Sequence, residues 1–225
     1  MGKIRKCYID IEAVYCGVYN PDKEKEKEVF FKDFPNWKFY DEKIEDGKEI
    51  IDEGIIGLLT IDINVSGHQY TTSERFIQLI GKDCSKERLM KELDGTNEII
   101  SYNGCHFDFP VINAQLGVTL DNIQGIKNTD LVLSCQKANM YGGLKNVEKQ
   151  LSGYPPGIPE RKSGISNGKT WSLASQLYHR IDDEEIKPKL LYMIKAYNEE
   201  DVRNLYYIEQ ILQYYQPKNY QDSIW

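Results

Sequence analysis

The sequence opens on a β-forming run that carries two acids, Tyr8-Ile9-Asp10-Ile11-Glu12. Side chains of a strand alternate between its two faces, so Asp10 and Glu12 project on one face and the isoleucines on the other. Two neighbouring carboxylates in a low-dielectric setting repel each other, and a bound divalent cation relieves that repulsion. Taken alone, the run leaves two explanations open, because periodicity does not separate them: a metal-binding strand face, or a solvated face on which both acids meet water.

A third acid interrupts an apolar stripe late in the chain. Apolar residues recur at helical spacing between Ile186 and Leu212, and the same spacing passes through Tyr197 and Asp201. A buried carboxylate needs a compensating cation, which leaves two explanations open. One is a metal site. The other is a buried ion pair with Lys145 or Arg203, although Arg203 is two positions away on the helix and cannot face Asp201 directly.

A fourth acid stands at a predicted helix entrance. The segment Asn103-Gly104-Cys105-His106-Phe107-Asp108-Phe109-Pro110 follows a short apolar strand and is typical of an Asn-Gly turn leading into a helix. Two roles for Asp108 stay open at this point: it caps the helix by accepting backbone N–H bonds, or it joins the other acids.

Together the three segments resemble the exonuclease motifs of the DEDD superfamily. The order D-I-E, then N-G-x-x-F-D-x-P, then Y-x-x-x-D is similar to the branch with tyrosine in the last motif (DEDDy), in particular the exonuclease domain of family B DNA polymerases and the YprB-type ribonuclease H-like predicted exonucleases. The resemblance extends from Tyr8 to about Leu212. It implies five catalytic residues, namely Asp10, Glu12, Asp108, Tyr197 and Asp201.

The resemblance implies a metal-dependent 3′–5′ exonuclease that releases nucleoside 5′-monophosphates. Carboxylate ligands suit Mg²⁺ or Mn²⁺, and two such ions activate a water and stabilise the leaving oxygen. By resemblance, Asp10 bridges both ions, Glu12 and Asp201 complete the site that activates water, and Asp108 holds the other ion largely through waters. Tyr197 would orient the attacking water, because an ordinary phenol is a poor base near neutral pH. The alternative for Tyr197 is a core tyrosine on an amphipathic helix.

The expected substrate is a single-stranded DNA or RNA 3′ end. The isoelectric point of about 5.1 argues against broad binding to duplexes, whereas a single-stranded end can be held by aromatic stacking and a few cations. Asn103 and Phe107 match substrate-contacting positions in the second motif of the related exonucleases. Lys145 and the loop from Arg161 to Lys169 are candidate phosphate contacts, and a merely solvated loop is the alternative.

Two rival functions stay open. One is a structure-specific endonuclease of the same fold, which would cut internally. The other is a catalytically idle module that binds nucleic acid or docks a protein, although a pure scaffold gains nothing by burying four acids.

A charged segment, residues 20–54, is expected as an insertion after the first strand. It holds seven lysines and twelve acids, a balance of −5 that accounts for most of the net −7 of the chain. Such composition favours a solvated loop or hairpin. Its six aromatic residues leave a lid or a surface for a protein partner open as well.

Length and composition favour one domain, residues 1–215, followed by a tail at 216–225. No apolar run approaches the length that crosses a bilayer, and the first residues lack the hydrophobic core of a signal peptide. The five cysteines show no metal-ligand spacing. They are interpreted as reduced thiols of a cytoplasmic protein.

The periodicity predicts an α/β fold in which helices flank a mixed five-stranded sheet, and the resemblance implies that this fold is ribonuclease H-like. Strands are expected at residues 4–11, 55–63, 68–76, 98–102 and 125–128, with a hairpin turn near Ser66-Gly67. Helices are expected at residues 85–93, 109–116, 130–139, 144–151, 171–179 and 184–214, with a loop at 152–169.

Overall fold

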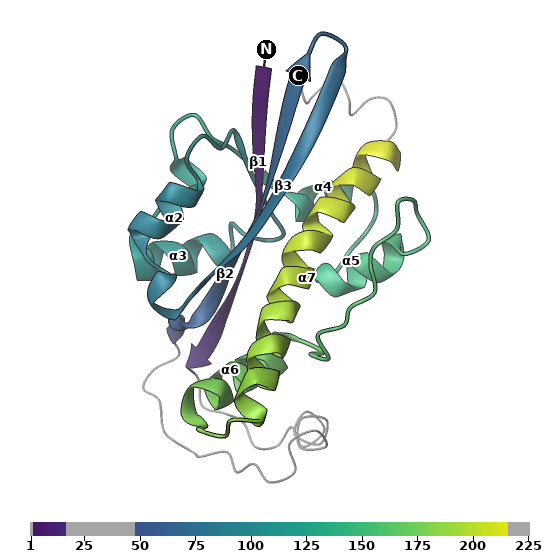
Figure 1. Cartoon of the computed structure of the whole chain (residues 1–225). Helices are drawn as coiled ribbons and strands as arrows, with labels where there is room; N and C mark the ends of the chain where they lie inside the picture. Colours follow the sequence, from purple (N-terminus) through teal and green to yellow (C-terminus); the bar gives the residue numbers. More distant parts are fainter. Residues whose placement is uncertain (1, 17–47, 216–225) are drawn as a thin grey trace.

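A computed structural model describes residues 2–16 and 48–215, whose strands form one mixed sheet (Figure 1). The strand order is β3-β2-β1-β4-β5. β1 pairs antiparallel with β2, and β2 antiparallel with β3, whereas β4 lies parallel to both β1 and β5. The expected mixed five-stranded sheet is confirmed. Its strands are β1 (Gly2–Cys16), β2 (Lys48–Ser66), β3 (Gln69–Ile80), β4 (Glu98–Ser101) and β5 (Lys127–Asp130).

Helices cover both faces of this sheet (Figure 1). One face carries α2 (Lys86–Glu92) and α3 (Asp108–Leu116). The long helix α7 (Ile186–Tyr215) crosses the other face, together with α4 (Leu131–Lys137), α5 (Leu144–Leu151) and α6 (Gly168–Arg180). Two short 3-10 turns, η1 (Gly81–Asp83) and η2 (Leu120–Asn122), complete the described elements.

The alternation of β1 divides its side chains between two cores. Cys7, Ile9 and Ile11 pack into the core beneath α2 and α3, whereas Tyr8 packs with Val202 and other residues of α7. The face that Tyr8 shares with Asp10 and Glu12 is therefore the face that α7 covers.

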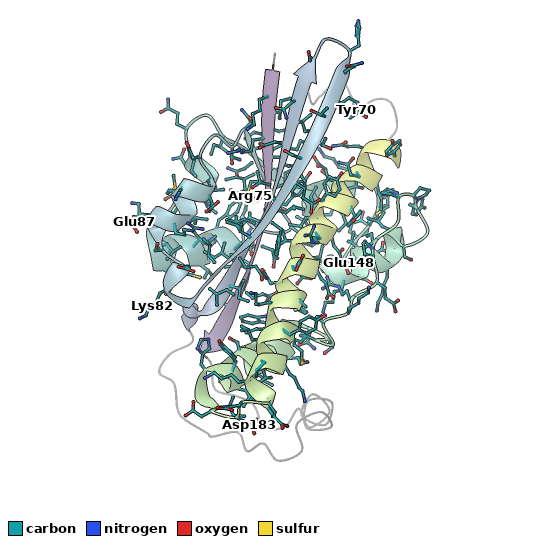
Figure 2. The ribbon with its side chains drawn as sticks, viewed as in Figure 1. Tyr70, Arg75, Lys82, Glu87, Glu148 and Asp183 are labelled. Atoms are coloured by element: carbon teal, nitrogen blue, oxygen red, sulfur yellow. The ribbon has the colours of Figure 1, made fainter. Side chains whose placement is uncertain are left out.

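β2 and β3 form a long hairpin whose tip extends beyond the helices. β2 ends at Ser66 and β3 begins at Gln69, which confirms the turn expected near Ser66-Gly67. Gly67 adopts a φ of 63°, a left-handed conformation that glycine tolerates. Tyr70 lies exposed near the tip (Figure 2).

The second strand begins earlier than the sequence predicts, at Lys48 and not at Ile55. β1 continues to Cys16 past an irregularity between Glu12 and Val14, and it pairs there with residues 48–50. Residues 48–54 of the expected insertion are therefore strand, because pairing with β1 outweighs their charged composition. The rest of that segment lies outside the described residues, as does the expected tail, 216–225.

The predicted helices are confirmed with small shifts at their ends. The helix at 144–151 is observed with the predicted bounds, and Pro188 lies in the first turn of α7 as expected. α6 begins at Gly168, ahead of the expected Trp171. β5 lies at Lys127–Asp130, two residues beyond the expected position. Within residues 2–16 and 48–215, every helix is too short or too polar to traverse a bilayer.

Candidate active site

Three acids meet where β1 passes under α7. Asp10 and Glu12 of β1 and Asp201 of α7 each offer a carboxylate oxygen, and these oxygens lie within 4.8 Å of one another. Glu12 and Asp201 are buried, and Asp10 is half-buried. Three anions at this spacing repel strongly in a buried setting.

Burial and mutual repulsion raise the pKa of Asp10 and of Glu12 well above the ordinary range. For both residues burial is the largest cause. Asp201 and Asp108 add to the shift of Asp10, whereas Asp10 and Asp201 add to that of Glu12. The pKa of Asp201 is also raised by burial, although Arg161 opposes that shift. This set of oxygen donors fits a hard divalent cation, which would neutralise charge that the protein only partly compensates.

Asp108 is hydrogen-bonded to the backbone of β1, near the three acids. Its Oδ1 accepts a 3.0 Å hydrogen bond from the Ile11 N–H. Ile11 is paired with Ile56 of β2, but the registered pairing of β1 with β4 ends at Tyr8, so the Ile11 N–H donates to this carboxylate and not to β4. Burial raises the pKa of Asp108 to about 7, and the Ile11 N–H opposes the shift.

Asp108 does not occupy the N-cap position of α3; its carboxylate instead accepts the bond from β1. Asp108 is the first residue of α3, and the capping position belongs to Phe107, which makes no side-chain cap bond. Asp108 is not among the three acids whose oxygens lie within 4.8 Å of one another.

A tight turn after β4 aims Asp108 toward β1. A Cβ atom on Gly104 would lie 2.3 Å from the Ser101 Oγ, so only glycine fits there. Asn103 has a φ of 60°, and its N–H donates a 2.7 Å bond to Asp130. The side chains of Asn103 and Phe107 are exposed on this turn, where a substrate could reach them.

The stripe predicted on the long helix is confirmed. Tyr197 and Asp201 are buried at 4% and 6% exposure, between Ile194 and Leu205 of the same stripe. Burial, Asp201 and Glu12 together raise the pKa of Tyr197 above its ordinary value, so its hydroxyl stays neutral. The Asn198 amide donates 3.3 Å bonds to the carbonyl oxygen and to Oδ2 of Asp10, which links α7 to β1.

The cation beside Asp201 is neither of those that the sequence pointed to. Arg161 forms the ion pair with Asp201. Arg203 pairs with Glu199 of its own helix and with Glu74 of β3.

Lys145, expected to contact substrate, lies close to the acids without pairing with one. Its Nζ donates to the Ser166 carbonyl oxygen at 2.6 Å and lies 4.2 Å from the centre of the Tyr197 ring. The loop expected to be either solvated or phosphate-binding is thus fixed against the site: Lys145 bonds its carbonyl oxygens, and Glu200 of α7 accepts a 2.8 Å bond from the Ser163 N–H.

Sequence reasoning assigned no role to Glu148, which holds Arg161 in place. The Arg161 Nε donates a 2.8 Å bond to the Glu148 Oε2, and Glu148 is buried. A signal was available. Glu148 falls on the apolar stripe of α5 between Val147 and Leu151, which is the same kind of interruption that singled out Asp201.

The comparison with protein families adds one match. A family model, RNase_H_2, described as RNase_H superfamily, matches residues 52–213. That range contains Asp108, Tyr197 and Asp201 but neither acid of β1, whose place in the group rests on the geometry of the sheet. No curated protein matches the chain in a sequence comparison.

Proposed function

Because the chain belongs to the ribonuclease H superfamily, we propose that it is a metal-dependent 3′–5′ exonuclease of the DEDDy type. Membership of this superfamily supports a metal-dependent nuclease. The assignment as a DEDDy-type 3′–5′ exonuclease is supported by one observation. Carboxylate oxygens of Asp10, Glu12 and Asp201 lie within 4.8 Å of one another, and Tyr197 lies one helical turn before Asp201 on the buried side of α7.

The acids would hold two ions, Mg²⁺ or Mn²⁺. Asp10, Glu12 and Asp201 form the set for one ion, and Asp10 with Asp108 the set for the other. When bound, such ions supply a water of lowered pKa, shield the phosphate and stabilise the leaving 3′ oxygen.

The remaining residues position the substrate and the attacking water. Tyr197 carries a neutral hydroxyl, since burial and carboxylates raise its pKa, and it orients the water by a hydrogen bond. Asn103 and Phe107, exposed on the turn before α3, contact the terminal nucleotides by hydrogen bonding and stacking. Lys145 approaches the phosphate from α5. Single-stranded DNA or RNA with a free 3′ end fits this sparse set of cations.

The test is hydrolysis of single-stranded oligonucleotides by the purified protein with Mg²⁺ or Mn²⁺. A 5′-labelled substrate is expected to shorten by one nucleotide at a time, and a 3′-labelled substrate is expected to release labelled mononucleotide at once. Asp10→Asn and Asp201→Asn should each lower turnover by more than about 100-fold. Both variants should stay folded by circular dichroism. Glu87→Gln, an exposed acid on α2 (Figure 2), is the matched control and should keep full activity.

Each rival function has its own result. Internal fragments from the labelled oligonucleotide would identify an endonuclease, and binding without hydrolysis would identify an idle module. Hydrolysis that persists at the wild-type rate in both asparagine variants would refute the assignment of the site.

Residues 1–215 would form one catalytic domain with a tail at 216–225, and the segment at 20–54 would offer a surface for a protein partner. The scattered cysteines favour a cytoplasmic protein.

A further inference from the structure

One guanidinium contacts both a candidate metal ligand and a buried glutamate. Arg161, in the segment between α5 and α6, pairs with Asp201 of α7 and with Glu148 of α5. Its side chain is 18% exposed, so solvent screens these contacts only in part.

Arg161 is anchored without the help of Asp201. Glu148 receives the 2.8 Å bond from the Arg161 Nε and a 3.0 Å bond from the Asn204 amide, so both of its oxygens are occupied. The backbone beyond Arg161 is fixed as well, because the Lys162 and Ser163 N–H groups donate to Glu200 of α7. The guanidinium is therefore held beside Asp201 by bonds that do not involve Asp201.

We propose that Arg161, held by Glu148, is a positioning residue that competes with the divalent ion for the Asp201 carboxylate and thereby sets the metal affinity of the site. This inference rests on the proposed function, since it requires Asp201 to be a metal ligand. A carboxylate oxygen in contact with a guanidinium has less charge to offer to an ion. Binding of the ion must therefore weaken the contact between Arg161 and Asp201.

Glu148 and Arg161 should affect metal affinity in opposite directions. Without the positive charge of Arg161, Asp201 is free for the ion and binding tightens. Without the negative charge of Glu148, Glu200, whose carboxylate lies 3.9 Å from the guanidinium, still offsets part of the charge of Arg161. More of the positive charge then acts on Asp201, and binding weakens.

Lys145 provides a control for the general electrostatic field. Its Nζ lies near the same acids but bonds to the carbonyl oxygens of Ile165 and Ser166, at 3.4 and 2.6 Å, and makes no ion pair among the described residues. Removal of its charge changes the field at the site without freeing a ligand. A smaller effect on metal affinity than that of Arg161 is therefore expected.

Arg75 provides a control for loss of an arginine that pairs with a buried glutamate. Its Nη2 donates a 2.6 Å bond to Glu92, which is 5% exposed. Arg75 lies on β3 and pairs with Glu92 of α2, whereas Glu148 lies on α5, on the other face of the sheet (Figures 1 and 2). Its substitution should leave metal binding unchanged.

The experiment titrates the full chain with MnCl₂ in a calorimeter, without nucleic acid, for the wild type and four variants. Arg161→Gln should lower the Mn²⁺ dissociation constant by about tenfold, and Glu148→Gln should raise it by a similar factor. Lys145→Gln should change it by less than about threefold, and Arg75→Gln should leave it at the wild-type value. The rise of the melting temperature with Mn²⁺ should follow the same order, because a ligand of the native state stabilises it in proportion to affinity.

Should either single variant fail to fold, the double variant Glu148→Gln/Arg161→Gln removes both charges together and leaves neither unpaired. It should bind Mn²⁺ more tightly than the wild type. Unchanged or weaker binding after removal of Arg161, alone or in the double variant, overturns the inference. An equal gain in Mn²⁺ affinity in Lys145→Gln also overturns it, because the gain would then come from removal of any nearby positive charge and not from release of Asp201.

Failure of the proposed function gives a different result. If neither the wild type nor any variant binds Mn²⁺, the metal site and this inference fall together. If the wild type binds Mn²⁺ and hydrolyses its substrate while Arg161→Gln leaves the affinity unchanged, only the inference falls.

Discussion

Gly57 of β2 packs so closely against Asn198 of α7 that a Cβ atom at position 57 would lie 2.3 Å from the Asn198 Oδ1. Gly57 is also the registered partner of Asp10 in the sheet. Asn198 in turn donates to Asp10, so the missing side chain allows α7 to approach β1 at the level of the site. This close approach brings Asp201 to the two acids of β1.

Gly57→Ala should therefore damage both stability and the site. The added methyl group would also lie 2.6 Å from the Val202 Cγ2, so the side chains of Asn198 and Val202, or α7 with them, must shift away from the sheet. We expect the free energy of unfolding to fall by about 1–3 kcal/mol and Mn²⁺ binding to weaken, as measured by chemical denaturation and calorimetry. Gly153→Ala is the control, because its Cβ would meet nothing within 4 Å. Wild-type stability and metal affinity in Gly57→Ala would contradict the role given to this contact.

Tyr197→Phe should lower turnover without loosening the fold. The variant removes only the hydroxyl that orients the attacking water, and misplacement of a reacting group costs roughly 100-fold in rate. We expect kcat to fall by that order at saturating Mn²⁺, with the Mn²⁺ dissociation constant and the melting temperature nearly unchanged. Tyr192→Phe, an exposed tyrosine of the same helix, should behave as the wild type. An unchanged kcat in Tyr197→Phe would leave Tyr197 as a core residue.

Without divalent ions, the protein should lose stability as the pH rises toward neutrality. The pKa of the folded Asp108 carboxyl is raised to about 7, whereas the unfolded chain releases that proton near pH 3.9. Between these values the native state binds more protons than the unfolded state, so the free energy of unfolding falls as the pH rises. Asp10, Glu12 and Asp201 are shifted in the same direction.

Denaturation in EDTA between about pH 4 and pH 7 measures this slope. Asp108→Asn should make it shallower, and Mn²⁺ should restore stability at neutral pH by compensating the ionised acids. If Asp108→Asn leaves the pH dependence of the free energy of unfolding unchanged, the raised pKa of Asp108 does not contribute to that dependence.

The convergence of Asp10, Glu12 and Asp201 could be foreseen in part, because their positions follow from periodic patterns. Asp10 and Glu12 share one face by the two-residue repeat of a strand, and Asp201 interrupts the stripe of a helix, so both placements follow from local geometry. The pairing of Arg161 with Asp201 could not be read in this way. Arg161 lies in a segment without periodicity, and its partner is fixed only when α5 and α7 pack together.

The early start of β2 was missed for a related reason. The charges near Lys48 resemble those of the preceding segment, and no local pattern reveals that β1 continues to Cys16 to pair with them. The bond from Ile11 to Asp108 likewise depends on where two strands separate. The residue at which two paired strands separate depends on tertiary packing, so the contacts made there cannot be predicted from local sequence patterns.

The position of β1 in the sheet has a consequence for heating and partial opening. Between Lys6 and Tyr8 this strand is bonded to β2 on one side and to β4 on the other, so its amide protons should exchange with deuterium only when the whole molecule opens. Asp10 and Glu12 follow this segment in the same strand. Fraying at the ends of the sheet therefore leaves the spacing of these two acids intact, and on warming that spacing should persist until the native state itself unfolds.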